Sequence, residues 1–362
     1  MTKKTVLYDR HVSAGAKIVD FAGWMMPVQY AGVLAEHATV RNNAGVFDVS
    51  HMGEVFVTGP EAPAFVDNLV TNDTRGMSDG NILYTVMCDN AGFVIDDLLV
   101  YKIGPQKFLL VVNASNTEKD FKWMLSQKGR FNVEVADRSP DLGMLAVQGP
   151  KAVAIASKII AIPKNLKYYN FFTVMRDGNE LIVSRTGYTG EDGVEIIAKN
   201  DDIVKLWDAL FEAGKSEGIA PAGLAARDLL RIEAGYSLYG HELDEKTDPL
   251  SAGLSWVVKM EGREFVGKAV LKNFGRDNKR ICFAMEGKAV PRQGYKLLTN
   301  GKESGFVTSG TFSPVLQKPF GIGYILGEGG NAPLDGSLTV EIRGREIPAK
   351  IVKPPVRLRV GG

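Results

Sequence analysis

The sequence predicts an α+β protein that consists of two ferredoxin-like halves and a C-terminal β-barrel. Three observations lead to this fold class: a strand-to-helix motif occurs twice, two further strands and a helix follow each copy, and the last quarter of the chain is rich in short strands. A chain of 362 residues can bury about three quarters of its unfolded surface, so two or three domains are expected.

The repeated motif is a strand-like run that ends in Gly-Pro and enters a helical pattern. Its copies occupy 53–60 and 143–150, 90 residues apart, and the helical patterns follow over 61–69 and 151–160. Proline is well tolerated in the first turn of a helix, because its missing N–H would have no partner there. The proline of each copy therefore predicts a helix start.

A pair of strands and a second helix are expected after each copy. In the first copy these elements are predicted over 94–102, 108–113 and 119–126, and in the second over 181–185, 194–198 and 203–213. The candidate N-caps are Ser115 or Asn116 for the first helix and Asn200 or Asp201 for the second. This element order is the core of a split β-α-β unit, so we infer two ferredoxin-like halves. A chance likeness of two α/β stretches is the alternative.

The tail from Arg280 onward has short β-rich runs separated by turn signals such as Asn300-Gly301 and Gly329-Gly330. It predicts a separate small β-barrel or sandwich, linked to the second half by a short helix over 261–274. The predicted domains are one ferredoxin-like domain over 53–139, a discontinuous ferredoxin-like domain over 1–52 and 140–260, and the linker helix with the barrel over 261–362.

Composition and charge narrow the function classes. The 43 basic and 42 acidic residues give a net charge of +1, which favours neither nucleic acid nor anionic lipid. No segment approaches the roughly 18 apolar residues of a membrane span, and the first residues lack the apolar region of a signal peptide. We expect a cytoplasmic protein without a metal, because the four histidines are scattered and Cys88 and Cys282 suit buried packing positions.

Charged side chains within apolar strands are the first candidates for a site. Asp96 and Asp97 interrupt a strand, and alternation places them on opposite faces, so one of them faces the interior. A buried carboxylate is costly unless it is hydrogen-bonded or faces a charge, which makes this pair a site candidate. An aspartate in a turn or at a sheet edge is the alternative. Glu195 is a similar charge, and we place its strand as the counterpart of the Asp97 strand.

Arg227 and Arg231 lie four residues apart on one face of a predicted helix. Two arginines in this arrangement suit either the binding of a ligand or salt bridges along the helix. The glycines of 185–193 have the wrong spacing for a phosphate loop, and a wide hairpin turn is the simpler interpretation. Because the chain has neither a Walker loop nor a complete dinucleotide fingerprint, nucleotide binding is not expected.

Seven motifs together resemble those of one enzyme family. In chain order they are FAGWMMP at 21–27, FDVSHMG at 47–53, IDDL at 95–98, RTGYTGEDG at 185–193, LAARD at 224–228, GLSW at 253–256 and TSGTFSP at 308–314. The set resembles the aminomethyltransferases, the T-proteins of the glycine cleavage system. The resemblance implies a three-domain cloverleaf around a central folate channel.

The implied reaction moves an aminomethyl group from the lipoyl arm of glycine cleavage H-protein to tetrahydrofolate. Its products are 5,10-methylenetetrahydrofolate, ammonia and dihydrolipoyl H-protein. By resemblance, Asp97 is the catalytic carboxylate and acts electrostatically, Glu195 binds the pterin, and Arg227 contacts the folate. Six more residues match positions in the channel wall, with core packing as the alternative for each: Met52, Tyr84, Asn113, Tyr188, Tyr236 and Trp256.

The C-terminus departs from the family, because aromatic residues often follow Lys-Pro there and this chain has arginines. Arg357 or Arg359 is therefore a candidate for the glutamate tail of the folate. Three other functions are weighed. The folate-binding part of a dimethylglycine or sarcosine oxidase would come with a flavin domain, for which this chain has no dinucleotide fingerprint. An accessory protein of iron-sulfur cluster maintenance would need a cysteine motif that 234–242 lacks. A non-catalytic module would not need Asp97, Glu195 and Arg227.

Overall fold

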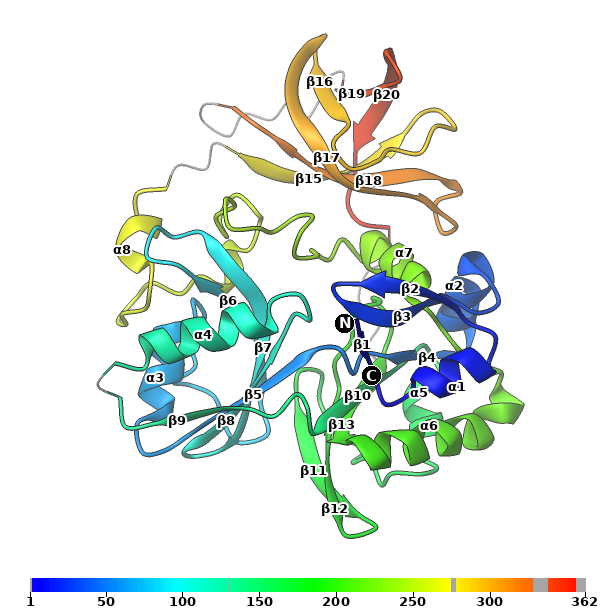
Figure 1. Cartoon of the computed structure of the whole chain (residues 1–362). Helices are drawn as coiled ribbons and strands as arrows, with labels where there is room; N and C mark the ends of the chain where they lie inside the picture. The colour runs from blue at the N-terminus through cyan, green and yellow to red at the C-terminus, as the bar shows by residue number, and fades with distance from the viewer. Residues whose placement is uncertain (1, 130, 275–277, 328–337, 356–362) are drawn as a thin grey trace.

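The computed structural model describes residues 2–129, 131–274, 278–327 and 338–355. Three bodies lie around a common centre, with the barrel above two α/β bodies in the view of Figure 1. The predicted α+β class with a C-terminal barrel is confirmed. Among the helices of the described ranges, none combines the length and apolar character that a membrane span needs.

The first ferredoxin-like body contains a five-stranded sheet in the order β6-β7-β8-β5-β9. Its strands are β5 (Gly53–Thr58), β6 (Ile82–Cys88), β7 (Val94–Gly104), β8 (Lys107–Val112) and β9 (Glu134–Asp137). Its helices, α3 (Ala62–Leu69) and α4 (Thr117–Gln127), cover one face, where Val55, Phe65 and Met124 are buried together. Strands β5, β7, β8 and β9 have the neighbours of a ferredoxin-like sheet, and β6 adds an edge strand.

The second body repeats this arrangement in a six-stranded sheet with the order β11-β12-β13-β10-β4-β14. Its strands are β4 (Ala44–Asp48), β10 (Leu142–Gln148), β11 (Phe171–Arg176), β12 (Asn179–Ser184), β13 (Gly193–Lys199) and β14 (Ile219–Pro221). The helices α5 (Ala152–Ala156) and α6 (Asn200–Gly214) pack on it. Because β4 comes from the N-terminal segment, the sheet supports the discontinuous domain, whose boundaries stay a prediction.

The open faces of the two sheets pack on one another. Tyr101 and Leu109 of the first sheet share a core with Phe47, Ala146 and Ile197 of the second. The N-terminal segment adds a small sheet with β1 (Lys3–Lys4), β2 (Lys17–Phe21) and β3 (Trp24–Gln29), and the helices α1 (Tyr8–Ser13), α2 (Val33–Asn42) and α7 (Leu224–Ala234) lie nearby in Figure 1. This central packing fixes the distance between strands of different halves.

The C-terminal body is a closed barrel, which decides between the predicted barrel and sandwich. Its strands run in the order β15-β18-β17-β16-β19-β20. They are β15 (Lys279–Met285), β16 (Lys296–Thr299), β17 (Lys302–Ser313), β18 (Lys318–Ile325), β19 (Leu338–Ile342) and β20 (Arg345–Ile351). The predicted Asn300-Gly301 turn joins β16 to β17 with a positive φ at both residues, whereas Gly329 and Gly330 lie outside the described residues.

Several predicted elements need correction. The linker helix over 261–274 is limited to α8 (Lys268–Leu271), because Gly262 and Gly267 adopt positive φ angles of 66° and 85° that interrupt a helix. The helix over 151–160 ends early, at Ala156. The repeat prolines precede the N-cap residues Glu61 and Lys151, so they lie just outside the first turn.

The cap and strand assignments differ in four further respects. Asn116 is the N-cap residue of α4, but its side chain makes no capping hydrogen bond, and the N-cap of α6 is Lys199. The edge strands β6 and β11 were not predicted. Strand β13, which carries Glu195, pairs with β10 as β8 pairs with β5, so it corresponds to β8 and not to the Asp97 strand β7.

Candidate active site

A cavity of about 910 Å³ lies where the three bodies meet. This volume lies within the range of small-molecule sites. All nine predicted site residues line it: Met52, Tyr84, Asp97, Asn113, Tyr188, Glu195, Arg227, Tyr236 and Trp256. The structure therefore brings together side chains from β6, β7, β13, α7 and the loops between them, whereas Arg357 and Arg359 lie outside the described residues.

Asp97 is the carboxyl that reaches the cavity from β7. Tyr84 Oη donates a hydrogen bond to Asp97 Oδ2 at 2.9 Å, and Asn113 Nδ2 donates to Oδ1 at 3.0 Å. Burial, together with the negative charge of Asp96, raises the pKa of Asp97 to about 7. Near neutral pH this group therefore exchanges a proton readily, which suits a catalytic acid or base.

Asp96 lies on the opposite face of β7, as strand alternation predicted, and none of its surface is exposed. It accepts hydrogen bonds from the Asn113 backbone N–H at 2.9 Å, from Asn113 Nδ2 at 2.8 Å and from Asn116 Nδ2 at 2.6 Å. Asn113 Nδ2 thus contacts both carboxyls of the pair. Asp96 fixes Asn113, and Asn113 orients Asp97.

Glu195 is the second carboxyl of the cavity and is 4% exposed. Its Oε2 accepts a hydrogen bond from Thr186 Oγ1 at 2.5 Å. Burial raises the pKa of Glu195, and the nearby charge of Arg227 and the Thr186 bond partly oppose this effect. A ligand that donates further hydrogen bonds to Glu195 would stabilise its ionised form.

Arg227 projects from α7 beside Glu195. Its guanidinium carbon lies 4.9 Å from the ring centroid of Tyr188 and 5.9 Å from that of Phe47, and Nη1 has no hydrogen-bond partner within the described ranges. The alternative of a salt bridge along the helix applies to Arg231 instead. Arg227 therefore presents an unused donor to the cavity wall, although burial lowers its pKa.

Arg231 is structural. Its Nη1 lies 2.6 Å from Glu242 Oε2, its Nε 2.8 Å from Asp228 Oδ1, and its Nη2 donates to Ser309 Oγ of the barrel at 2.7 Å. Only 1% of Arg231 is exposed. These bonds attach α7 to the barrel and hold the helix that carries Arg227.

Two stacked aromatic pairs form the apolar walls. Tyr188 and Tyr236 have ring centroids 5.8 Å apart at an interplanar angle of 26°, and Tyr84 and Trp256 lie 5.7 Å apart at 21°. Trp256 is 56% exposed and marks the rim of the cavity. Flat aromatic walls of this kind suit a ligand with planar rings.

Other cavity residues were not predicted. His51 has an Nδ1 with no partner in the described part of the chain, and burial lowers its pKa to about 4, so the imidazole is neutral. Its place inside the FDVSHMG motif was a usable signal. Tyr168, Tyr169 and Arg280 also line the cavity, and no motif marks them.

The glycines of 185–193 fit the predicted wide turn between β12 and β13. A Cβ on Gly187 would lie 1.9 Å from Gln148 Oε1, and a Cβ on Gly193 would lie 2.3 Å from the Val147 carbonyl oxygen. The turn therefore packs directly on β10, which places Thr186 and Tyr188 at the cavity.

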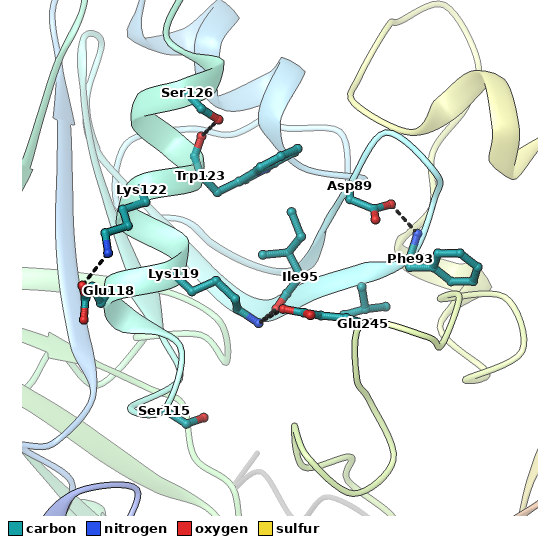
Figure 2. A pocket seen from close by; sticks show the side chains of 11 residues that line it. Asp89, Phe93, Ile95, Ser115, Glu118, Lys119, Lys122, Trp123, Ser126 and Glu245 are labelled. Atoms are coloured by element: carbon teal, nitrogen blue, oxygen red, sulfur yellow. Dashed lines mark hydrogen bonds and ion pairs between the residues drawn. The ribbon is translucent and has the colours of Figure 1, made fainter.

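A second hollow of about 790 Å³ lies between α4, β7 and the loop at Glu245 (Figure 2). The Lys119 side chain extends across it, and its Nζ donates to the Ile95 carbonyl oxygen at 2.8 Å. The hollow contains none of the predicted site residues, and Ser115 lines both this hollow and the central cavity. In the residues that the structure describes, no group of three or more His, Cys, Asp or Glu side chains is arranged to hold a metal ion.

Comparison with known proteins gives consistent similarities along the chain. Residues 7–262 match the family described as GCVT N-terminal domain, and residues 278–356 match the family described as glycine cleavage T-protein C-terminal barrel domain. Aminomethyltransferases of Halothermothrix orenii and Pseudothermotoga lettingae are each 45% identical, over 98% of this chain and 99% and 97% of their own lengths.

A solved structure extends the similarity to three dimensions. The crystal structure of the glycine cleavage system aminomethyltransferase T from Bartonella henselae superposes with a TM-score of 0.92 at 33% identity, and the match covers 99% of each chain. The similarity therefore includes all three bodies.

Proposed function

Because the chain belongs to the aminomethyltransferase family, the T-proteins of the glycine cleavage system, we propose that it takes its aminomethyl group from the lipoyl arm of H-protein. The enzyme is a folate-dependent aminomethyltransferase, and we propose 5,10-methylenetetrahydrofolate, ammonia and dihydrolipoyl H-protein as the products. The observation that supports this most is the convergence of Asp97, Glu195 and Arg227 on one cavity.

Glu195 is proposed to bind the pterin ring of tetrahydrofolate. A carboxylate can accept two parallel hydrogen bonds, one from the pterin ring N–H and one from its exocyclic amine. Thr186 uses one lone pair of Glu195 and fixes the carboxylate, and Arg227 Nη1 is available to donate to a pterin oxygen. The rings of Tyr188 and Tyr236 offer apolar faces for the remaining surface of the ligand.

Asp97 is proposed as the catalytic residue. Attack of folate N5 on the aminomethyl carbon forms the C–N bond and breaks the C–S bond, and the proton that N5 releases is balanced by the one that the thiolate takes up. The amine then gains a proton and leaves as ammonia, and N10 attacks the same carbon, closes the ring and releases its own proton. Asp97 stabilises the positive charge on the carbon, a contribution of about 3 to 4 kcal/mol, and its pKa of about 7 suits it to accept a proton.

H-protein is proposed to dock at the cavity mouth, near the exposed Trp256. Complementary charged patches would mainly set the rate of association. H-protein-dependent turnover should therefore fall as salt is added, while turnover at saturating H-protein should change little. Turnover that does not respond to salt would count against this docking site.

The decisive experiment measures ammonia release from aminomethyl-loaded H-protein and tetrahydrofolate. Release should depend on folate and should collapse in Asp97→Asn, while the folate Kd stays within about threefold. Asp177→Asn is a matched control, because Asp177 is 69% exposed and has a positive φ of 50° that Asn accepts equally well. A wild type that binds folate but releases no ammonia would favour the accessory-protein alternative.

A further inference from the structure

A third carboxyl, Asp120 on α4, lies behind Asp96 and Asp97 and has no role in the reaction described above. We propose that Asp120 is a positioning residue that retains its proton, donates it in a hydrogen bond to Asp96, and so holds Asn113 and Asp97 in place. The inference rests on the proposed function, because its purpose is to orient Asp97.

The surroundings of Asp120 are unusual for an acid. Its side chain is fully buried, and neither carboxyl oxygen has a hydrogen-bond donor among the described residues. Asn116 begins this turn of α4: its Nδ2 donates to Asp96 Oδ1 at 2.6 Å, and its carbonyl oxygen accepts from the Asp120 backbone N–H at 2.8 Å. The start of α4 therefore lies against the Asp96 carboxyl, whose charge raises the pKa of Asp120. Two carboxyls in contact need a proton between them, because two adjacent anions away from water repel strongly.

The donors present decide which carboxyl holds the proton. Asp96 accepts three N–H hydrogen bonds, two from Asn113 and one from Asn116, all between 2.6 and 2.9 Å. Such donors stabilise the ionised form, and Asp120 has none of them. Asp96 is therefore the anion and Asp120 the acid, and burial beside Asp96 raises the pKa of Asp120 to about 11.

The charged groups around Asp120 do not alter this assignment. Lys119, its neighbour on α4, points away into the hollow of Figure 2. There its Nζ donates to the Ile95 carbonyl oxygen and to Tyr239 Oη, and it lies 3.2 Å from Glu245 Oε1. The Lys119 charge lowers the pKa of Asp120, but the charges of Asp96 and Asp97 on β7 raise it. Tyr239 is a weak acid whose own pKa is raised by burial and by nearby carboxyls, first of all that of Glu245.

Asp120 and Asp96 are thus the first two members of a chain of hydrogen bonds that ends at Asp97. Asp120 donates to Asp96, Asp96 accepts from Asn113, and Asn113 Nδ2 donates to Asp97 Oδ1. Loss of the Asp120 donor would release one of the four bonds that fix Asp96. The effect would reach Asp97 as a change in orientation, without any contact between Asp120 and the substrate.

The first test compares Asp120→Asn with Asp120→Ala. An asparagine amide can still donate to Asp96, so kcat should stay within about threefold and the acid limb of kcat/KM within about 0.3 pH units of wild type. Alanine cannot donate, and kcat should fall about tenfold with the folate Kd unchanged. An ionised Asp120 would behave differently: Asp120→Asn would then move the acid limb about one pH unit lower, and this result would overturn the proposal.

The second test reads the proton directly and does not depend on turnover. Infrared spectra at about pH 8.5 should show the carbonyl stretch of a protonated carboxylic acid, part of which disappears in Asp120→Asn. Glu54, whose pKa is also raised well above its ordinary value by burial, should leave its own band in both proteins. An unchanged band would overturn the proposal even if Asp120→Ala fails to fold or if the proposed transfer reaction proves wrong.

Discussion

The substitution Asp97→Asn should make the protein more stable above neutral pH while it removes most of the activity. Burial and the charge of Asp96 raise the pKa of Asp97 from its ordinary 3.8 to about 7. Between these pH values the folded protein holds a proton that the unfolded chain has released, so the free energy of unfolding falls as pH rises. The stability that the retained proton of Asp97 adds to the folded state is fully present below about pH 4 and is lost above about pH 7.

The size of the effect follows from the pKa difference. Each pH unit corresponds to about 1.4 kcal/mol, so ionisation of Asp97 costs the folded state at most about 4 kcal/mol. One side of the carboxyl faces a cavity that water can enter, which reduces this cost, and we therefore expect ionisation to destabilise the folded state by about 1 to 2 kcal/mol. The amide of the variant carries no charge, and the Tyr84 hydroxyl can either donate to its oxygen or accept from its nitrogen.

The assay is urea unfolding of wild type and Asp97→Asn at about pH 5 and about pH 8.5. Between the two pH values, the free energy of unfolding of the variant should rise by about 1 to 2 kcal/mol relative to that of wild type. The kcat of the variant should be about 100- to 1000-fold lower than that of wild type. Asp73→Asn is the control, because Arg75 lowers the pKa of Asp73 to about 2 at the surface. The free energy of unfolding of Asp73→Asn should be lower than that of wild type by under about 1 kcal/mol, and by the same amount at both pH values. A stability difference for Asp97→Asn that does not change with pH would refute the reasoning.

Three further changes test other parts of the site. Glu195→Gln removes charge-assisted hydrogen bonds to the pterin and should weaken folate binding about 10- to 100-fold by calorimetry, without a loss of stability. Trp256→Ala removes the exposed ring stacked on Tyr84, so KM for folate should rise about tenfold while the free energy of unfolding changes by under about 1 kcal/mol. Arg231→Met leaves Glu242 as an unpaired buried charge and should lower the free energy of unfolding by about 3 to 5 kcal/mol.

The sequence was most informative where a local pattern determines the structure. The Gly-Pro repeat led to two related sheets, and the turn signals of the tail led to a barrel, because strands and turns have short-range signatures. The edge strands β6 and β11 were missed because a split β-α-β unit has no place for them. The linker helix was predicted too long, because helical periodicity does not reveal the positive φ of Gly267, where a Cβ would lie 2.7 Å from the Asp89 carbonyl oxygen.

The site shows the same division. Strand alternation could predict that Asp96 and Asp97 face opposite sides, but only the family resemblance selected Asp97 as the catalytic residue. Arg227 and Arg231 lie on the same helical face, and partners outside the helix, Glu242 and the barrel residue Ser309, determine that Arg231 is the one held in place. Asp120 gave no signal, because an acid in a helix of mixed charges is usually exposed, and its burial depends on the packing of α4 against β7.

The buried carboxyls differ mainly in the donors that surround them. Asp97 has two side-chain donors and a pKa of about 7, whereas Asp120 has none among the described residues and a pKa of about 11. Asp97 also borders the cavity, whereas Asp120 has no exposed surface, and these differences together give two different protonation states at neutral pH. Burial and the negative charge of Asp96 on the other face of β7 raise the pKa of Asp97, and the donors of Tyr84 and Asn113 oppose them, so Asp97 stays near the point where it gains and loses a proton. The carboxyl that we propose as catalytic thus depends on a second carboxyl on the other face of the same strand.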